Sequence, residues 1–304
     1  MSENTKPNNE RPADLAVQDS VGGMARRLLN PAHLRDIAGR SVKTLREQGA
    51  EQLWRDVKFR VGLAMHHDDW RHRADIPLRR ELKAQRAAHL QGPKISIIVP
   101  LYNTPLDFLE ELLDSVVNQT YRNWELCCVD AGTAPGVGEM VQQRAAVDPR
   151  IRYRKLEKNE LIPGNTNKGI EMATGDFIAL LDHDDILHPC ALWYAAKAIA
   201  EQGADFVYTD EVTFEGDIDH LTVYHFKPDY MLDNLRSNNY ICHLTVFSRA
   251  LMERAGGGER MEYNGSQDYE LFLRLTEQAE KIVHIPHALY YWRSSPGSTA
   301  ADIS

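Results

Sequence analysis

The chain lacks the long apolar runs, paired cysteines and apolar leader that mark membrane-spanning or secreted proteins. No stretch approaches the roughly 20 apolar residues that a membrane helix requires, and residues 1–20 are too polar for a signal peptide. Only four cysteines occur in 304 residues, without the CxxC spacing of a metal site. We therefore expect buried free thiols and a reducing, cytoplasmic location.

The charge is unevenly divided along the chain. Residues 1–92 carry 17 Lys and Arg against 12 Asp and Glu, a balance of +5, whereas residues 93–304 carry 18 against 32, a balance of −14. The acidic part argues against nucleic-acid binding, in which phosphate contacts supply most of the affinity. The basic part fits either a solvated helical face or a surface for anionic lipid or a partner protein. The second interpretation would place the protein peripherally at the inner face of the membrane.

Three segments follow from the local composition. Residues 1–23 are polar, with few large apolar side chains, and predict a disordered tail. Residues 24–92 have apolar residues at spacings near three and four, which predicts an α-helical N-terminal extension. The sequence Gln-Gly-Pro then breaks this pattern, and residues 93–304 form the predicted main domain.

Short apolar strands alternate with amphipathic helices in the main domain, which predicts an α/β fold with helices on both faces of a sheet. The predicted strands are residues 95–100, 124–130, 151–155, 175–181 and 205–210. The predicted helices are residues 106–118, 137–146, 165–173 and 191–202. After residue 212 the alternation becomes irregular, and one further helix is predicted at 268–278.

Three carboxylates, Asp182, Asp184 and Asp185, crowd the end of a buried strand in the segment LLDHDDILHP. Like charges this close repel each other, so their placement costs stability unless a cation neutralises them. Oxygen ligands favour Mg²⁺ or Mn²⁺, which usually keeps substrate phosphate oxygens in its shell. The spacing alone fits equally well a helix N-terminus capped by carboxylates, with Pro189 in the first turn.

Other polar side chains follow the strand ends, where open α/β sheets bind their ligands. Tyr102 and Asn103 follow the first strand and could pack on and hydrogen-bond a base, whereas Asp130 ends the second and could accept from a base or ribose. Each is also an ordinary turn residue when considered alone. Together with Asp182 they indicate a nucleotide-diphosphate site.

Several ordered segments carry a family resemblance. PKISIIVPLYNTP, QTYRNWELCCVDAG, NTNKGIEMATGDFIALLDHDD and GSQDYELFLRL resemble, in order and spacing, the family 2 glycosyltransferases of the GT-A fold. YICHLTVFSRALMERAGG and HIPHALYYWRSSPGSTA resemble a subgroup that assembles bacterial surface polysaccharides. The resemblance starts at Pro93 and implies a GT-A domain with a mixed, mostly parallel sheet over residues 93–304.

The resemblance implies roles for particular residues. Asp182 and Asp184 lie on the D-x-D motif and would hold Mn²⁺ or Mg²⁺, and Asp268 matches the catalytic base of inverting members. Asp210 would line the donor-sugar pocket, and Arg293 would assist the leaving group. The residues that would bind the nucleotide are Pro100, Tyr102, Asn103, Asp130, Asn167, Lys168 and Asp182.

The chain departs from the family pattern at three places that matter, one of which, Gln267-Asp268 in place of the usual Glu-Asp, keeps the predicted base. It reads VDAGT where many members have VDDGS, which leaves the donor open among UDP-, dTDP- and GDP-linked sugars. It also has Ser295 after Arg293-Ser294, where many relatives have a histidine that reaches the metal or diphosphate. His284 or His287 would substitute for it, or water and phosphate would complete the shell.

The implied activity is metal-dependent, inverting transfer of a sugar from a nucleotide sugar to a hydroxyl of a glycan or lipid-linked glycan. Such a reaction would belong to bacterial surface-polysaccharide biosynthesis, with the basic N-terminal extension contacting membrane or a partner transferase. Two alternatives remain open. One is a nucleotidyltransferase, which would release pyrophosphate. The other is a non-catalytic nucleotide- or glycan-binding subunit, an alternative that the absent histidine keeps open.

Overall fold

The computed structural model describes Ala50 and residues 79–218 and 220–294. The described residues from Arg80 onward form one compact unit. The predicted tail at 1–23 and, apart from Ala50, the extension up to residue 78 lie outside the described residues. The last part of the extension is helix α5, Arg79–Ala88, which packs with the sheet through the buried Leu82.

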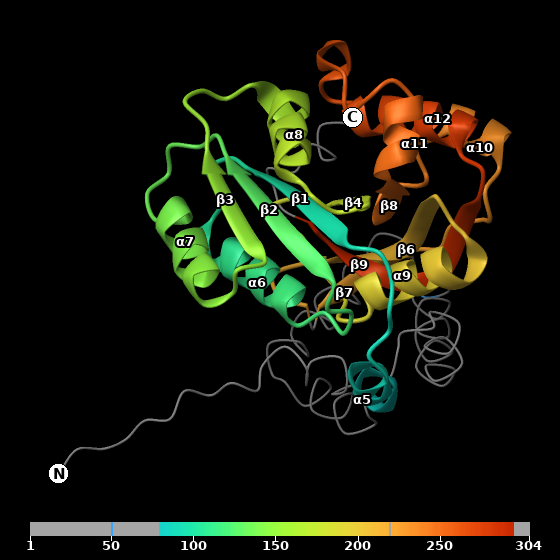
Figure 1. Ribbon diagram of the computed structural model, residues 1–304, viewed down its shortest axis with the longest axis horizontal. Helices are drawn as coiled ribbons and strands as arrows, with labels where there is room; N and C mark the ends of the chain where they lie inside the picture. Colours follow the sequence, from blue (N-terminus) through green and yellow to red (C-terminus); the bar gives the residue numbers. More distant parts are fainter. Residues whose placement is uncertain (1–49, 51–78, 219, 295–304) are drawn as a thin grey trace. The chain divides into compact units, whose positions relative to one another are not determined.

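A nine-stranded sheet forms the centre of the described unit, in the order β3-β2-β1-β4-β8-β6-β9-β5, with β7 paired to β6 (Figure 1). The strands are β1 Ile95–Leu101, β2 Trp124–Asp130, β3 Ile151–Lys155, β4 Phe177–Leu180, β5 Ile186–Leu187, β6 Phe206–Phe214, β7 Leu221–His225, β8 Thr245–Ser248 and β9 Ile282–Arg293.

The strand directions confirm a mixed, mostly parallel sheet. Strands β1 to β4 are parallel, β8 is antiparallel to β4, and β6 and β9 return to the direction of β1. Six of the nine described strands (β1, β2, β3, β4, β6 and β9) therefore run the same way. In consequence the carboxyl ends of β1, β2 and β4 meet the amino end of β8 at one edge of the sheet.

Helices cover both faces, as predicted. Along β1 the side chains alternate, so that Ile97 and Val99 pack in the cluster that includes α6, α7 and α9, whereas Ile98 packs with α8, α11 and α12. None of the described helices is long and apolar enough to cross a membrane. The helices are α6 Leu106–Val117, α7 Val137–Val147, α8 Leu161–Met172, α9 Ala191–Gln202, α10 Leu232–Ser237, α11 Arg249–Arg254 and α12 Gln267–Gln278, with the 3₁₀ turn η1 at Met261–Tyr263.

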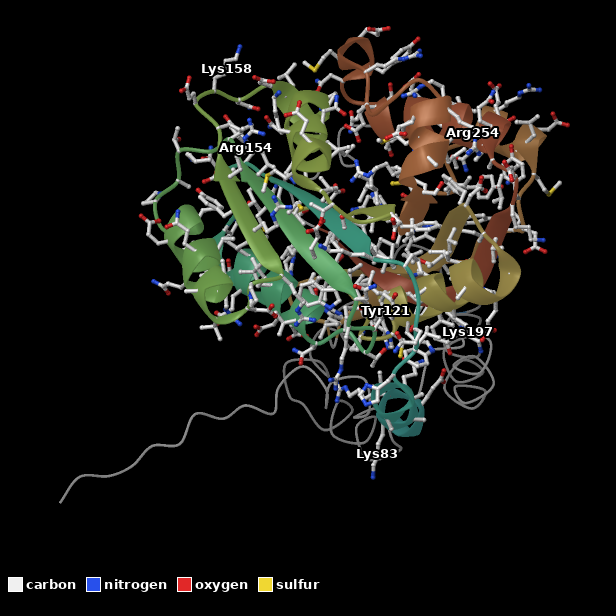
Figure 2. All side chains as sticks on the ribbon, viewed as in Figure 1. Lys83, Tyr121, Arg154, Lys158, Lys197 and Arg254 are labelled. Atoms are coloured by element: carbon white, nitrogen blue, oxygen red, sulfur yellow. The ribbon has the colours of Figure 1, made fainter. Side chains whose placement is uncertain are left out.

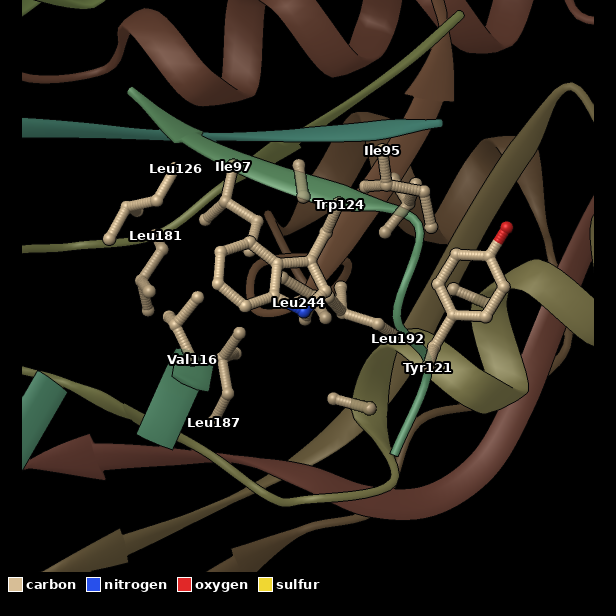
Figure 3. Close-up of a cluster of buried hydrophobic side chains, with 14 of the residues drawn as sticks. Ile95, Ile97, Val116, Tyr121, Trp124, Leu126, Leu181, Leu187, Leu192 and Leu244 are labelled. Atoms are coloured by element: carbon tan, nitrogen blue, oxygen red, sulfur yellow. The ribbon is translucent and has the colours of Figure 1, made fainter. Parts of the chain in front are cut away.

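The larger apolar cluster surrounds Trp124, whose ring lies among aliphatic side chains that include Leu126, Leu187 and Leu192 (Figure 3). Strand β1 is buried along almost its whole length, as its almost continuous apolar run predicts for a strand covered on both faces. Charged side chains such as Lys197 project from the outside of the unit (Figure 2). The core therefore fixes the strand ends, and the polar residues that follow them are held on a rigid frame.

The four cysteines are free, as predicted. Cys127, Cys128 and Cys190 are buried, and Cys242 is partly buried. Burial raises the pKa of the Cys127 thiol to about 12, which keeps it protonated and unreactive at neutral pH.

Helix α8 begins four positions before the predicted start at Asn165. The Asn159 side chain accepts a hydrogen bond from the Leu161 N–H at 2.9 Å, and the Asn165 carboxamide oxygen accepts one from the Glu160 N–H at 3.1 Å. These bonds satisfy amide groups at the helix start. Pro163 lies in the first turn, where its missing N–H costs nothing.

The region after residue 212 contains more regular structure than predicted. It includes β7, α10, β8, α11 and the long strand β9, in addition to the helix predicted at 268–278. Pro286 interrupts the apolar pattern of β9, and the pairing register with β6 shifts at Asp210. The helices α10 and α11 have six residues each, which is too short for a helical period to be recognised.

Candidate functional site

The three clustered carboxylates occupy a turn after β4 and differ in their surroundings. The side chain of Asp182 is 56% exposed and Asp184 is half-buried, whereas Asp185 is 1% exposed. The Tyr290 hydroxyl donates to Asp185 at 2.5 Å and the Arg293 N–H donates to it at 2.7 Å. Asp185 therefore anchors the turn to β9, and Asp182 and Asp184 remain for a ligand.

The alternative that these carboxylates cap a helix is wrong. Strand β5, Ile186–Leu187, follows the turn directly, and α9 begins only at Ala191, after Cys190 at its N-cap position. Burial, and then repulsion by Asp182 and Asp184, holds the pKa of Asp185 well above its usual range. A buried carboxyl in its neutral form can donate as well as accept a hydrogen bond.

His243, for which the sequence predicted no role, lies beside Asp182. Its Nε2 is 3.4 Å from an Asp182 carboxylate oxygen, and its Nδ1 is 3.4 Å from a Glu211 oxygen. Tyr290 stacks on the imidazole, with ring centroids 4.7 Å apart. Lys227 completes the row, with its ammonium nitrogen 3.2 Å from Glu211. The segment ICHLTV carried a family resemblance, but only the structure brings its histidine to the carboxylate turn.

The contacts among Lys227, Glu211 and His243 determine the charge next to Asp182. Burial opposes protonation of His243, but Cys242, Asp182 and Glu211 together hold its pKa well above the usual range. Loss of part of its surrounding water opposes ionisation of Asp182, yet the hydrogen bond and charge of His243 lower its pKa. At neutral pH an imidazolium therefore faces an ionised carboxylate.

Asp268 lies in the first turn of α12, in the position predicted for the base. Its Oδ2 accepts a hydrogen bond of 2.9 Å from the Asn239 side chain. Asn239 and His243 belong to one short segment before β8, and this segment therefore contacts Asp268 at one end and Asp182 at the other. The predicted base and the predicted metal ligand are thus tied to the same stretch of chain.

The ends of β1 and β2 are joined by side-chain hydrogen bonds. The Asn103 carboxamide oxygen accepts from the N–H groups of Thr133 and Ala134, at 2.7 and 2.9 Å. Gly132 allows this approach, since a Cβ there would lie 2.4 Å from the Asn103 nitrogen. The predicted nucleoside residues Asn103 and Asp130 therefore lie on neighbouring strand ends.

Asp130 is buried and has protein partners at both oxygens. Oδ1 accepts from the Gly132 N–H at 2.9 Å, and Oδ2 accepts from the Tyr153 hydroxyl at 2.7 Å and from Lys155 at 2.9 Å. Tyr102, by contrast, is 50% exposed. The carboxylate of Asp130 orders the strand-end loop, and the phenol ring of Tyr102 is open to a ligand.

The remaining residues predicted to bind the nucleotide lie on α8 and at the end of β1. Pro100 is partly buried within β1. The Asn167 side chain accepts a hydrogen bond from the Glu259 N–H at 3.0 Å and donates one to the Glu259 carbonyl at 2.7 Å. Lys168 is paired with Glu171 at 2.9 Å. Their contacts with a nucleotide stay predictions.

Asp210 and Arg293 are more deeply engaged in the protein than predicted. Asp210 is 2% exposed and accepts from the Lys227 N–H at 2.9 Å and from His284 Nε2 at 2.8 Å. Arg293 is 2% exposed, donates to the Asp184 carbonyl at 2.7 Å, and pairs with Glu111. These contacts favour positioning roles over direct contact with the sugar or leaving group.

The two histidines proposed as substitutes have other partners. His284 lies between Asp210 and Asp229, at 2.8 and 3.3 Å, and stacks on Tyr208. His287 packs against the ring of Tyr194, with centroids 4.5 Å apart. Apart from its chain neighbour His183, the histidine that the structure brings to Asp182 is His243.

A divalent cation fits the exposed Asp182 together with the half-buried Asp184. Within the described residues, no group of three or more His, Cys, Asp or Glu side chains is arranged to hold a metal. Mg²⁺ and Mn²⁺ commonly use one or two protein carboxylates and complete their shell with water and substrate phosphates. Burial and repulsion by Asp182 act to raise the pKa of Asp184. A cation between the two carboxylates would offset this repulsion and favour their ionised forms.

Comparison with known proteins gives matches to the same part of the chain, the main domain that contains these residues. The family model "Glycosyl transferase family 2" matches residues 96–256, just over half of the chain. The chain is 44% identical over 215 residues to the uncharacterized protein y4gI of Sinorhizobium fredii, covering 69% of this chain and 23% of that protein. It is 35% identical over 211 residues to the O-antigen biosynthesis protein RfbC of Myxococcus xanthus, covering 69% and 16%. The chain therefore spans less than a quarter of the length of these two relatives.

Solved structures share the fold. S. aureus TarS 1–349 in complex with UDP-GlcNAc matches with a TM-score of 0.59 and 20% identity, covering 69% of this chain and 61% of that one. The mannosyltransferase PcManGT from Pyrobaculum calidifontis, in complex with GDP-Man and Mn²⁺, matches with a TM-score of 0.52 and 18% identity, covering 69% and 60%. At this identity the likeness establishes the fold.

Proposed function

The chain belongs to glycosyl transferase family 2, and from this we propose that it moves a sugar from a nucleotide sugar to a hydroxyl of a glycan or lipid-linked glycan. The observation that carries the proposal is the single segment that holds Asp268 through Asn239 and Asp182 through His243. Such a transfer requires a base near the acceptor and carboxylates near the diphosphate, held at a fixed distance from each other.

The donor is a nucleoside diphosphate sugar linked to UDP, dTDP or GDP. In support, TarS is in complex with UDP-GlcNAc and PcManGT with GDP-Man. In this proposal the nucleoside lies at the ends of β1 and β2, against the exposed ring of Tyr102 and the loop ordered by Asn103 and Asp130. The diphosphate then lies towards the turn after β4, with Asn167 and Lys168 of α8 nearby.

Asp182 and Asp184 are the residues that hold Mn²⁺ or Mg²⁺ in this proposal. When bound, the cation offsets the negative charge that grows on the departing diphosphate. His243 keeps Asp182 ionised and oriented, since its imidazolium faces the carboxylate. Arg293 and Tyr290 hold the turn that carries both ligands.

Asp268 acts as the general base. Asn239 donates to one of its carboxylate oxygens and fixes its orientation. Asp268 takes the proton of the acceptor hydroxyl as the oxygen attacks the anomeric carbon, and the bond from that carbon to the diphosphate oxygen breaks on the opposite face. The products are an inverted glycoside and a nucleoside diphosphate.

The process in which this transfer takes place is surface-polysaccharide synthesis. In support, the relative RfbC of Myxococcus xanthus is an O-antigen biosynthesis protein. The excess of basic residues in residues 1–92 would hold the chain at an anionic membrane surface, close to a lipid-linked acceptor.

A turnover experiment separates this proposal from its rivals. Wild type and Asp268→Asn are incubated with UDP-, dTDP- and GDP-sugars and Mn²⁺, and released nucleoside diphosphate and pyrophosphate are both measured. We expect nucleoside diphosphate from wild type, at least about a hundredfold less from Asp268→Asn, and unchanged donor affinity. Pyrophosphate release would identify a nucleotidyltransferase. Donor binding without turnover by wild type would identify a binding subunit.

A further inference from the structure

Glu259 is a buried carboxyl group without a protein partner at one of its oxygens. The residue is 7% exposed, and its Oε2 forms no hydrogen bond with the described residues. An unpaired buried polar group costs free energy, so its persistence requires a reason. Glu259 lies in the segment AGGGER, between α11 and η1, to which the sequence assigned no function.

The backbone of this segment is held firmly in place. The Asn167 side chain accepts from the Glu259 N–H at 3.0 Å and donates to its carbonyl at 2.7 Å. Gly258 permits the contact, because a Cβ at this position would lie 2.2 Å from the Asn167 oxygen. Helix α8 therefore positions Glu259 from one side.

Helix α12 holds the same segment from the other side. The Arg274 guanidinium donates to the carbonyls of Ala255, Gly257 and Gly258 at 2.8, 2.9 and 2.6 Å. Glu270 fixes Arg274 in turn, through contacts of 2.6 and 2.9 Å. The backbone of this segment is thus fixed by hydrogen bonds from two helices, while one carboxyl oxygen of Glu259 has no partner. This combination is typical of a functional position.

Glu259 lies next to the proposed reaction site, because its backbone is hydrogen-bonded by Asn167, one of the residues proposed to bind the nucleotide. Burial raises its pKa to about 8, and the negative charges of Asp268 and Asp182 contribute to this, whereas the hydroxyl of Thr166 on α8 opposes it. The charges of the proposed base and of a proposed metal ligand therefore both act on the Glu259 carboxyl group. In its protonated form a carboxyl can donate one hydrogen bond and accept others, and a sugar hydroxyl, which also does both, is its natural partner.

We propose that Glu259 hydrogen-bonds a hydroxyl group of a substrate sugar beside Asp268. This inference rests on the proposed glycosyl transfer and adds a substrate-binding residue to it. The sugar is either the one transferred or the one that receives it. Since both offer the same hydroxyl chemistry, the experiment distinguishes them.

The test uses the full chain and the variants Glu259→Leu and Glu259→Gln, with Glu253→Gln on the exposed surface of α11 as the matched control. Titrations with Mn²⁺ and UDP, dTDP, GDP or CDP identify the nucleotide, and its sugar-linked forms follow. Turnover is then measured with glucose, galactose or N-acetylglucosamine as added acceptor. Thermal denaturation accompanies each variant.

If Glu259 contacts the donor sugar, Glu259→Leu binds the nucleotide as wild type does but binds the nucleotide sugar about tenfold more weakly. If it contacts the acceptor, both affinities stay unchanged and the acceptor KM rises by about the same factor. In either case Glu259→Leu unfolds at a higher temperature than wild type, because it removes an unpaired buried carboxyl, so misfolding cannot explain the loss.

Unchanged donor affinity and unchanged acceptor KM in both variants would overturn the role of Glu259 while leaving the transferase intact. Absence of nucleotide binding by wild type would overturn the proposed function itself. Glu253→Gln is expected to match wild type in every measurement.

Discussion

Asp182, Asp185 and Glu259 are acidic residues with three different surroundings. Asp182 is exposed and faces the His243 imidazolium, Asp185 is buried and receives two hydrogen bonds, and Glu259 is buried with one oxygen unpaired. The first is suited to a cation, the second to anchoring a turn, and the third to a substrate hydroxyl. These differences arise from tertiary contacts.

The raised pKa of Glu259 predicts how stability changes with pH. Its pKa rises from 4.5 to about 8 on folding, so the native state binds more protons than the unfolded state between these values. Stability is therefore lost as pH rises through this window, and the loss is complete above it. Each pKa unit corresponds to about 1.4 kcal/mol, so the full effect is no more than about 5 kcal/mol.

Urea denaturation of wild type and Glu259→Gln from pH 5 to pH 9 measures this effect. We expect the stability of the variant relative to wild type to increase as pH rises, because glutamine does not titrate. A difference that is constant across the range would show that Glu259 keeps an ordinary pKa.

Residue roles were only partly predictable from the sequence. Asp182 and Asp184 could be singled out because their spacing at a strand end is unusual, and the structure leaves both open to a ligand. His243 and Glu259 could not, because an isolated histidine or glutamate has no spacing that reveals its neighbours. The sequence also could not reveal that Arg293 is buried and engaged by Asp184 and Glu111.

At the scale of elements, the turn after β4 depends on β9 for its shape. Tyr290 donates to Asp185 at 2.5 Å and accepts from the Asp182 N–H at 3.3 Å, so one hydroxyl joins two residues of the turn. We predict that Tyr290→Phe lowers the free energy of unfolding by about 1–3 kcal/mol, because it leaves buried polar groups unpaired. It should also weaken Mn²⁺-dependent nucleotide binding.

Urea denaturation and calorimetric titration check both parts of this prediction. Tyr263→Phe, at a tyrosine that is 42% exposed, is the matched control and should change neither quantity. Equal stability of Tyr290→Phe and wild type would show that the Tyr290 hydroxyl is dispensable for the turn.

The junction between the ends of β1 and β2 gives a second prediction at this scale. Gly132→Ala places a Cβ 2.4 Å from the Asn103 nitrogen and 2.8 Å from its side-chain oxygen. The two strand ends must separate, and we expect nucleotide affinity to fall by about tenfold or more with circular dichroism unchanged. Wild-type affinity in this variant would exclude the β1–β2 junction from the nucleoside site.

Elements could be predicted accurately where clear breaks bound a run of apolar or alternating residues. Strands β2 and β3 and helix α9 have the predicted boundaries, since each is an apolar or amphipathic run between polar breaks. Strand β9 was missed because Pro286 interrupts it and its pairing shifts register beside β6. Its recognition requires β6 as a partner, which only the folded sheet supplies.

At the scale of the whole molecule, the division of charge separates two parts of the chain. Residues 1–92 carry a balance of +5 and residues 93–304 a balance of −14. If the basic part contacts anionic lipid, the full chain should bind vesicles that contain phosphatidylglycerol, and this binding should weaken as salt rises.

Vesicle sedimentation at low and physiological salt tests this prediction. Vesicles of phosphatidylcholine alone serve as the control, because they share the bilayer but not its negative charge. Equal binding to both compositions, or no binding to either, would contradict a role for the basic part at an anionic membrane.

In the proposed function, the turn after β4 is the metal-dependent part of a nucleotide-sugar site. Calorimetric titration of UDP, dTDP, GDP and CDP, each with and without Mn²⁺, tests it on wild type and Asp184→Ala. We predict that wild type binds one of these nucleotides in a Mn²⁺-dependent manner and that Asp184→Ala loses this binding. Failure of wild type to bind any of the four, or equal metal-dependent binding by the variant, would contradict the claim.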